Sequence, residues 1–421
     1  MIYRHALIPK YNRLLSALRG KRSWWTKNYV MSLAKEIANG GVVNPKRRKP
    51  RNHHRNRGFA VTEMAILDDE TFKRMFRLDR GTFHELADDI NPYIDRDASK
   101  AKNSSGSAIP TTTRLAVTLR WLAGGQQLDL CFAWGISKSV FFSNRGVLWP
   151  TIIAIDKVIK LGFPINDNDA LEELAAGFRE HSGGVLDNCV LAIDGMAVKT
   201  ICPSVFDVRQ RKDYRCRKGG FAIILMAGCD VRGKFFFATS NHSGSTNDII
   251  AWNDSKLCDA INDNKLPPQY FFIGDEAFTN TQQFLSPWSG RGLPKYKDSF
   301  NYWLSHSRQC IERAFGMLTQ RWGIFHRRFC FSFERWSLVT QVCLKLHNLC
   351  IDRNVSMPAR KFHEDHVNGD RWTVFENNDE EEDIALRGNA NGDRRRLITE
   401  RLEREGIVRP PHAQHNSRME A

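Results

Sequence analysis

The sequence contains no apolar run that approaches the roughly 18–20 residues of a membrane-spanning helix. Its N-terminus is basic and lacks the apolar segment of a signal peptide. These absences predict a soluble intracellular protein without a membrane partner. The length of 421 residues, of which 42% are hydrophobic, is sufficient for two or three domains with substantial cores.

No two of the ten cysteines form a C-x-x-C pair, and they are scattered from Cys131 to Cys350. This scatter argues against a zinc site and against a disulfide framework. We therefore expect reduced cysteines that serve as ordinary core residues. His347 lies between Cys343 and Cys350 at helical spacing, and for these three residues core packing is favoured over a metal site.

Acidic residues are almost absent from the first 57 residues, which hold 15 Lys and Arg against the single acid Glu36. This arm, taken as residues 1–58, therefore carries +14 of the chain's net charge of +15. Such an arm binds phosphate or is read as a nuclear-import address, here Lys46, Arg47, Arg48 and Lys49. The alternative is a merely solvated disordered tail.

Residues 70–175 have the apolar spacing of amphipathic helices, interrupted by a polar loop over 98–113. Within them, residues 128–141 have the outline of a helix-turn-helix, in which a short helix breaks at Gly135 and Ser137 caps a second helix. That second helix would offer Lys138, Ser139, Asn144 and Arg145 to a DNA groove. A helical pair packed only for the core explains the same pattern.

The periodicity changes from helix to strand from Val190 onward. The apolar run Cys189–Gly195 predicts a buried strand that ends in a carboxylate, Asp194, which should not be buried unpaired. Residues 221–230 and 234–239 predict a β-hairpin, followed by a helix over 246–258. Residues 270–275 then predict a second buried strand, and this one delivers Asp275.

A third acid, Glu312, lies on a predicted helix whose apolar stripe is Ile311, Phe315, Leu318 and Trp322. Another helix, over residues 333–351, would cover the sheet. Two aspartates on adjacent strands and a glutamate on a covering helix suit hard divalent cations, Mg²⁺ or Mn²⁺, and we expect two ions. Two such ions activate an attacking oxygen and stabilise the leaving oxygen in phosphodiester cleavage.

Each acid also has a plainer reading. Asp194 alone could be a turn residue and Asp275 a strand terminator, and Glu276 competes with Asp275 as a ligand. Successive strand residues point to opposite sides, so only one of that pair should face the site, and Asp275 is favoured. Asp248 is interpreted as a helix cap and Asp230 as a turn residue.

A basic segment lies between the first two predicted strands of the sheet. A solvated loop is the plain interpretation, but a position beside the carboxylates favours a grip on DNA phosphates, because it would offset the repulsion between DNA and the acids. The segment contains Arg209, Arg211, Lys212, Arg215, Arg217 and Lys218.

Several ordered blocks of the chain resemble the PIF/Harbinger transposases and their domesticated, Harbinger-derived nuclease relatives. The similarity spans residues 72–353. Its blocks are residues 186–195, 214–219, 244–248, 274–275, 300–301, 311–316 and 346–348, together with Arg308. The chain departs from the family at Met196-Ala197, where Thr-His is frequent, at Cys216, and near residues 277–279.

The resemblance implies an α/β fold, with an RNase H-like mixed sheet and flanking helices over residues 186–353. Its DDE triad would fall on Asp194, Asp275 and Glu312. It further implies two-metal cleavage and strand transfer on double-stranded DNA at transposon terminal repeats. A nuclear location, a Myb-like DNA-binding partner and a homo-oligomer would follow. The alternative is a domesticated, inactive copy that binds DNA and recruits the partner. Residues 354–421 are expected to be a mostly disordered polar tail with a short helix near 394–405.

Overall fold

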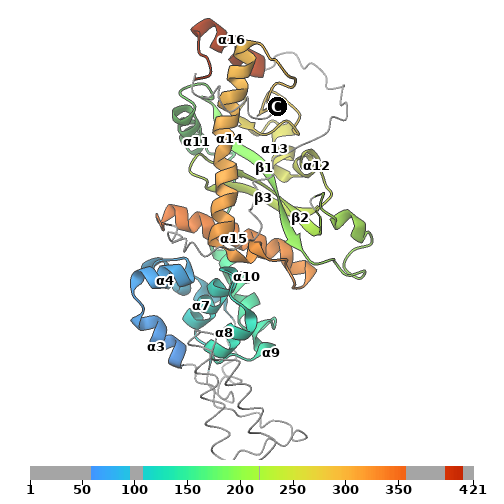
Figure 1. Cartoon of the computed structure of the whole chain (residues 1–421). Helices are drawn as coiled ribbons and strands as arrows, with labels where there is room; N and C mark the ends of the chain where they lie inside the picture. The colour runs from blue at the N-terminus through green and yellow to red at the C-terminus, as the bar shows by residue number, and fades with distance from the viewer. Residues whose placement is uncertain (1–57, 95–107, 218, 357–393, 411–421) are drawn as a thin grey trace, which may run out of the picture. The chain divides into compact units, whose positions relative to one another are not determined.

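The computed structural model describes residues 58–94, 108–217, 219–356 and 394–410 (Figure 1). All of them belong to the second of the two units into which the chain divides, residues 55–421. The nuclear-import residues Lys46, Arg47, Arg48 and Lys49 lie outside the described residues. Lys218 and most of the polar tail, residues 354–421, lie outside them as well.

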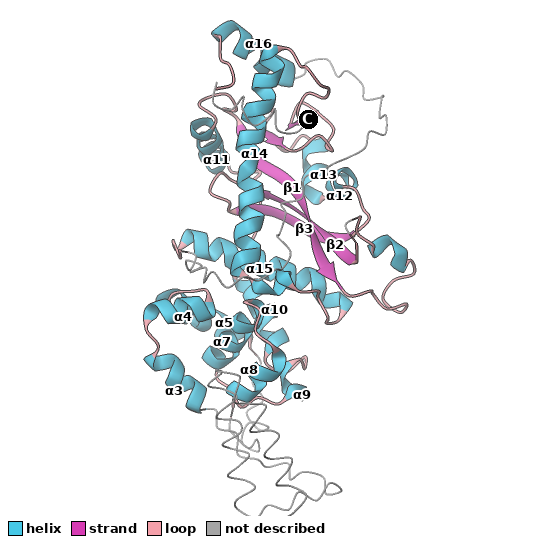
Figure 2. Cartoon of the chain, in the orientation of Figure 1, coloured by secondary structure: helices cyan, strands magenta, loops and turns pink. Residues whose placement is uncertain are grey.

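A five-stranded mixed sheet with the strand order β3-β2-β1-β4-β5 forms the centre of the structure (Figure 2). The first three strands pair antiparallel, whereas β4 and β5 run parallel to β1. The strands are β1 (Cys189–Thr200), β2 (Phe221–Cys229), β3 (Phe235–Ser243), β4 (Phe271–Ile273) and β5 (Phe284–Leu285). The mixed α/β class expected from the sequence is confirmed.

The β2–β3 hairpin is confirmed, and its turn is organised by one aspartate. Asp230 Oδ1 accepts hydrogen bonds from the backbone N–H groups of Arg232 at 2.9 Å and Lys234 at 2.8 Å. Gly233 adopts φ of 83°, which an L side chain rarely tolerates. Asp230 is therefore a turn residue, as predicted.

The strand that carries Asp194 is longer than its apolar run. β1 continues past Gly195 to Thr200, because every residue from Ala192 to Thr200 is paired with a residue of β2. The prediction that the strand stops at Gly195 is therefore wrong. The backbone ladder continues where the apolar side chains end, and Asp194 lies within the strand.

Helices cover both faces of the sheet. On one face, Ala192 and Ile273 share a buried core with α14 (Lys295–Arg321) and α15 (Trp336–Asp352). On the other face, Ile193 and Phe272 pack in a second core with Leu174 of α11 and Trp252 of α12. The bounds of the helices on this second face are α11 (Asn168–His181), α12 (Asp248–Asn253) and α13 (Lys256–Asn262).

The single helix predicted over residues 246–258 is thus two helices, α12 and α13. The break occurs because the chain turns at Asp254 and Ser255 starts a new helix, its Oγ accepting a hydrogen bond from Cys258 N at 3.2 Å.

Near the C-terminus, α16 (Arg394–Glu405) confirms the short helix predicted in the tail. Its buried Ile398 and Leu402 belong to the same core as α14.

The region before the sheet is helical, as predicted. Asp68 and Asp79 cap the N-termini of α4 and α5 by accepting hydrogen bonds from Thr71 N and Thr82 N. The helices are α3 (Gly58–Ile66), α4 (Asp69–Phe76), α5 (Arg80–Ile90), α7 (Thr111–Leu122), α8 (Gln127–Ala133), α9 (Lys138–Phe141) and α10 (Leu148–Val158). The described 3-10 turns are η1 (Asn91–Tyr93), η2 (Arg211–Tyr214), η3 (Gly323–His326) and η4 (Phe333–Arg335).

The expected helix-turn-helix is only partly formed. Gly135 adopts φ of 58° and Ser137 caps α9, both as predicted. However, α9 ends at Phe141 after four residues, so Asn144 and Arg145 lie beyond it rather than on a recognition helix.

In the part of the chain that the structure describes, no helix is long and apolar enough to cross a bilayer.

Candidate metal centre

The parallel pairing of β1 with β4 brings Asp194 and Asp275 together. Ala192 pairs with Ile273; Asp194 lies two residues further along β1, and Asp275 follows two residues after the end of β4. Because side chains alternate along a strand, residues two positions on return to the same face. Adjacent strands therefore place both carboxylates at one level, which confirms that the two predicted acids meet.

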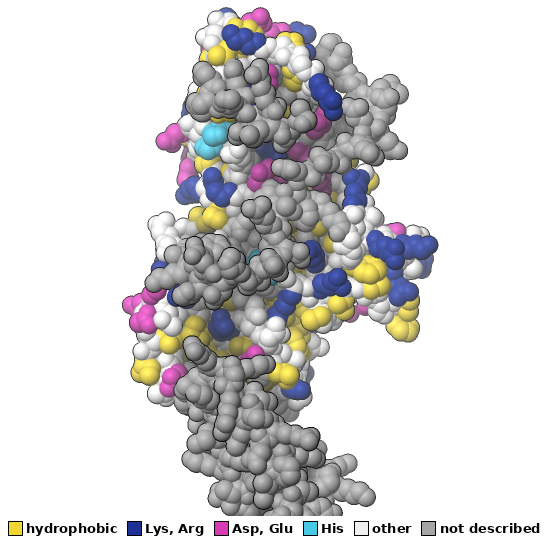
Figure 3. All heavy atoms as spheres, in the orientation of Figure 1, with side chains coloured by type: hydrophobic (Ala, Val, Ile, Leu, Met, Phe, Trp, Pro, Cys, Tyr) yellow, Lys and Arg dark blue, Asp and Glu magenta, His cyan; other side chains and the backbone are white. Residues whose placement is uncertain are grey.

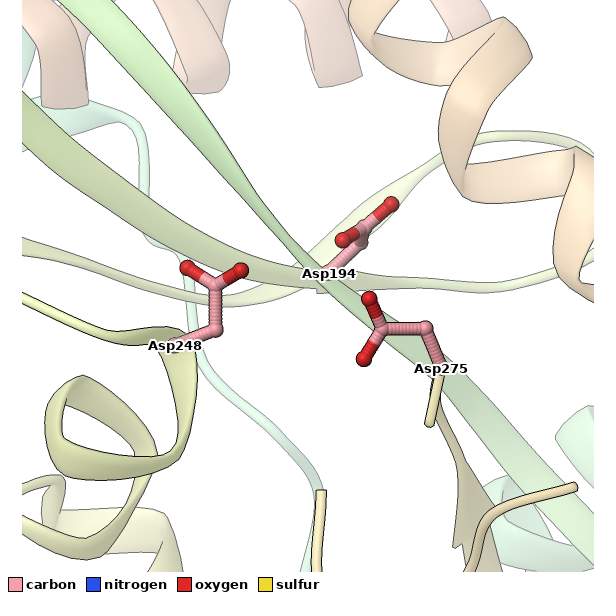
Figure 4. A group of neighbouring side chains, drawn as sticks. All are labelled: Asp194, Asp248 and Asp275. Carbon is pink, nitrogen blue, oxygen red and sulfur yellow. The ribbon is translucent and has the colours of Figure 1, made fainter. Parts of the chain in front are cut away.

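A third carboxylate, that of Asp248, completes the cluster (Figure 4). One oxygen from each of Asp194, Asp248 and Asp275 lies within 4.8 Å of the others. Among the described residues, no other group of three or more His, Cys, Asp or Glu side chains is placed to hold a metal ion. The three residues are hereafter called the aspartate cluster.

Asp248 reaches the cluster because of a helix start and a glycine. It is the first residue of α12, and Asn247 rather than Asp248 occupies the N-cap position, so the reading of Asp248 as a helix cap is wrong. A Cβ on Gly195 would overlap the Asp248 carboxylate. Sequence analysis missed this role of Asp248, and the glycine after Asp194 is the one signal of it, since Gly195 leaves room above β1 for a second acid.

Burial makes the cluster electrostatically costly without a cation. The Asp194 side chain is 16% exposed. Burial above all, together with Asp275 and Asp248, raises the pKa of Asp194 to about 7, although Arg308 and the Gly195 N–H oppose the rise. Burial and then Asp275 raise the pKa of Asp248 to about 6, against the influence of Arg217. A divalent cation would relieve the repulsion among these carboxylates.

Glu312 lies beside the aspartate cluster but is not part of it. Arg308 donates a hydrogen bond from Nη1 to Asp194 Oδ2 at 2.9 Å and from Nη2 to Glu312 Oε1. Arg308 and Glu312 lie one helical turn apart on α14, so the guanidinium bridges Asp194 of β1 and Glu312 of α14. The predicted triad residue therefore contacts Asp194 through Arg308.

The structure also sorts the competing residues. Glu276 is exposed, whereas Asp275 joins the cluster and accepts a hydrogen bond from Ala277 N at 3.0 Å. His347 is buried, and its Nε2 bonds with Gly233 O at 3.0 Å. It belongs to no metal-binding group of the described residues, so its prediction as a core residue is confirmed. All ten cysteines are free, and seven of them are buried.

The predicted phosphate-binding residues of the β1–β2 connection are exposed. An open hollow of about 660 Å³ is lined by Arg209, Arg211, Lys212 and Arg215, among others. Arg217 donates a hydrogen bond to Asn247 Oδ1 at 2.7 Å, immediately before Asp248. In the helical region, Lys138 and Arg145 are also exposed. DNA contact by all of these residues stays a prediction.

Comparison with known proteins connects this geometry to nucleases. Residues 193–348 match the DDE superfamily endonuclease family, a span that includes the aspartate cluster and Glu312. The chain is 25% identical over 301 residues to "Protein ALP1-like" of Arabidopsis thaliana, covering 68% of this chain and 71% of that protein. It is 22% identical over 312 residues to "Putative nuclease HARBI1" of Bos taurus, covering 72% and 84%. No solved structure matches the chain significantly.

Proposed function

The chain carries a DDE superfamily endonuclease domain, and from this premise we propose that it is a metal-dependent endonuclease that cleaves DNA phosphodiester bonds. The observation that carries the proposal is the aspartate cluster, in which two adjacent parallel strands and the start of α12 bring three carboxylates together. The resemblance of the sequence motifs to Harbinger-derived nucleases agrees with the relatives found.

We also propose that the domain is RNase H-like. Three antiparallel strands followed by two strands parallel to the first, in the order β3-β2-β1-β4-β5, support this assignment. The helix α14 then carries Glu312 alongside the strand that holds Asp194. This arrangement supports Asp194, Asp275 and Glu312 as the DDE triad, with Asp248 as a fourth acid.

The donor set fits a hard divalent cation such as Mg²⁺ or Mn²⁺. All of its side-chain ligands are carboxylate oxygens, and His and Cys do not contribute among the described residues. Asp194 and Asp275 would hold the metal, with Asp248 or Glu312 as a further ligand. Two bound ions would supply an activated water molecule and stabilise charge on the leaving oxygen.

Arg308 has a defined role in this proposal. Its guanidinium pairs with Asp194 and Glu312 and so partly neutralises them when they face each other without a cation. Arg308 occupies only Oε1 of Glu312, so Oε2 would be available as a ligand. The arginine therefore holds the glutamate close to the cluster, within reach of a cation.

On the resemblance alone, we extend the proposal to strand transfer by a DNA 3′-hydroxyl at transposon terminal repeats. A nuclear location, a Myb-like partner and a homo-oligomer belong to the same extension. One observation favours a second candidate, a protein that binds DNA without cutting it. Arg308 already supplies positive charge to Glu312 and Asp194, and it would compete with a cation for these two carboxylates.

A cleavage assay separates the two candidates. The full chain is incubated with supercoiled plasmid that carries the terminal repeats, in Mg²⁺, in Mn²⁺ and in EDTA. We expect nicking with metal only, and its loss in Asp194→Asn and Asp275→Asn. Glu276→Gln is the matched control, because Glu276 is the exposed neighbour of Asp275 and should leave cleavage intact. Binding without cutting by the wild type would favour the second candidate.

A further inference from the structure

The connection between β1 and β2 presents three large apolar side chains to solvent, and two of them, Val205 and Phe206, are adjacent. Phe206 is 96% exposed and Val205 is 61% exposed, although both lie in a described and hydrogen-bonded segment. A single exposed apolar residue is unremarkable on a protein surface. Here, however, the exposure coincides with a fixed backbone and with a basic surrounding, and these two features point to a ligand.

The backbone that carries these side chains is fixed by reciprocal hydrogen bonds. Ser204 N donates to Asp207 Oδ2 at 3.1 Å, and Phe206 N donates to Ser204 Oγ at 3.1 Å. Asp207 N and Val208 N both donate to Ser204 O, at 3.1 and 3.2 Å. The turn therefore holds the backbone at Phe206 in place, so little backbone ordering is needed when it binds a partner.

The surface next to this turn is strongly basic. In Figure 3, Lys and Arg side chains gather with hydrophobic ones on the lobe that projects to the right, where Figure 1 draws the connection between β1 and β2. In the described part of the connection, the acids are Asp207 and Asp213, and Asp207 is engaged within the turn. The exposed cations are Arg209, Arg211, Lys212, Arg215 and Arg217.

The far end of the connection is attached beside the aspartate cluster. Ser245 N donates to Asp213 O at 2.9 Å, and Arg217 Nη2 donates to Asn247 Oδ1 at 2.7 Å. Both contacts join the connection to the segment that leads directly into Asp248. A polyanion held by the basic side chains would therefore run toward the carboxylates.

We propose that Phe206, assisted by Val205, is a wedge that inserts into the base stack of DNA bound along this connection. The proposal rests on the proposed function in taking DNA as the polymer. Apolar side chains that enter between base steps unstack and kink a duplex, while neighbouring Lys and Arg bind its phosphates. An unstacked step would make the backbone near the metal centre easier to deform.

The test measures base unstacking directly. The full chain is bound in EDTA to short duplexes that carry 2-aminopurine at successive positions, so that cleavage plays no part. We expect wild type to raise the fluorescence at one or two positions, Phe206→Ala to abolish the rise and Phe206→Trp to retain it. Ile66→Ala is the matched control, since Ile66 is 72% exposed on α3 and lies outside the connection.

Salt dependence separates the wedge from the phosphate contacts. Phe206→Ala should weaken binding roughly ten-fold without changing the slope of log Kd against log salt, because it removes stacking and no charge. Arg211→Ala and Lys212→Ala should each reduce the slope by about 1. Fluorescence and affinity that are unchanged in Phe206→Ala would overturn the proposal.

The two proposals fail separately. If wild type unstacks bases in EDTA but does not cut in Mg²⁺, the wedge stands and the nuclease proposal fails. If wild type cuts in Mg²⁺ and Phe206→Ala unstacks bases as well as wild type does, the nuclease stands and the wedge is wrong.

Discussion

A Cβ built on Gly195 would lie 2.2 Å from Oδ1 of Asp248, so the absence of a side chain at residue 195 is what admits the third carboxylate. Real Cβ atoms do not approach an oxygen so closely, and a methyl group here must displace Asp248. The glycine beside Asp194 is thus a component of the aspartate cluster.

Gly195→Ala should therefore damage the cluster more than the fold. Overpacking at this position should cost about 1–3 kcal/mol of unfolding free energy. The affinity for Mn²⁺, measured by calorimetric titration, should fall at least about ten-fold as Asp248 is displaced. Gly162→Ala is the control, because a Cβ at Gly162 meets nothing within 4 Å. Unchanged Mn²⁺ affinity in Gly195→Ala would show that Asp248 is not part of a metal site.

Asp248→Asn should stabilise the protein in EDTA. The pKa of Asp248 is raised from 3.8 to about 6, so the folded state favours the protonated form, and this contribution to stability is lost as the pH rises through 6. At pH 8 the substitution should add about 1–2 kcal/mol to the unfolding free energy, and near pH 4 it should add almost nothing. Urea denaturation at both pH values measures the difference. An equal effect at the two pH values would contradict the repulsion within the cluster.

Arg308→Gln should make stability depend on metal. Without its guanidinium, Asp194 and Glu312 lose their shared cation, and unfolding in EDTA at pH 8 should become about 1–3 kcal/mol easier. Mg²⁺ should restore most of the loss, because it replaces the missing positive charge. Thermal denaturation with and without Mg²⁺ provides the measurement. Lys265→Gln, which breaks an exposed pair with Asp263, should change stability by less than about 0.5 kcal/mol under both conditions.

His347 should contribute to acid denaturation. Burial, and secondarily Arg321, lowers the pKa of His347 to about 4, so the folded protein keeps the imidazole neutral. Its contribution to stability is complete above pH 6.5 and is lost as the pH falls toward 4. His347→Gln, which can still donate to Gly233 O, should flatten the fall in stability over this interval by about 2–3 kcal/mol. Identical pH profiles for the two proteins would show that His347 does not titrate on unfolding.

Sequence reasoning reached Asp194 and Asp275 because their positions follow from strand physics. Two buried apolar runs that end beside acids become adjacent strands, and parallel pairing then fixes the acids at one level. The hairpin and the apolar stripe of α14 followed for the same reason, since each is encoded by a local period.

Asp248 was missed because its role depends on contacts between distant segments. Nothing local distinguishes it from a capping residue, and only the passage of the α12 start over Gly195 brings it to Asp194. The strand β5 has only two residues and is too short to show a period. It forms because its backbone pairs with that of Phe272 and Ile273 in β4. The ion pair between Arg308 and Asp194 likewise could not be predicted from the sequence, because it depends on where α14 lies relative to β1.

If Asp194 and Asp275 hold a divalent cation, anomalous X-ray diffraction from crystals soaked in Mn²⁺ will locate it. We expect an anomalous difference peak between these two carboxylates, bordered by Asp248 or Glu312. That peak should vanish in Asp194→Asn crystals and persist in Glu276→Gln crystals. Well-ordered wild-type crystals without a peak at the cluster, or a peak that survives Asp194→Asn unchanged, would contradict the claim.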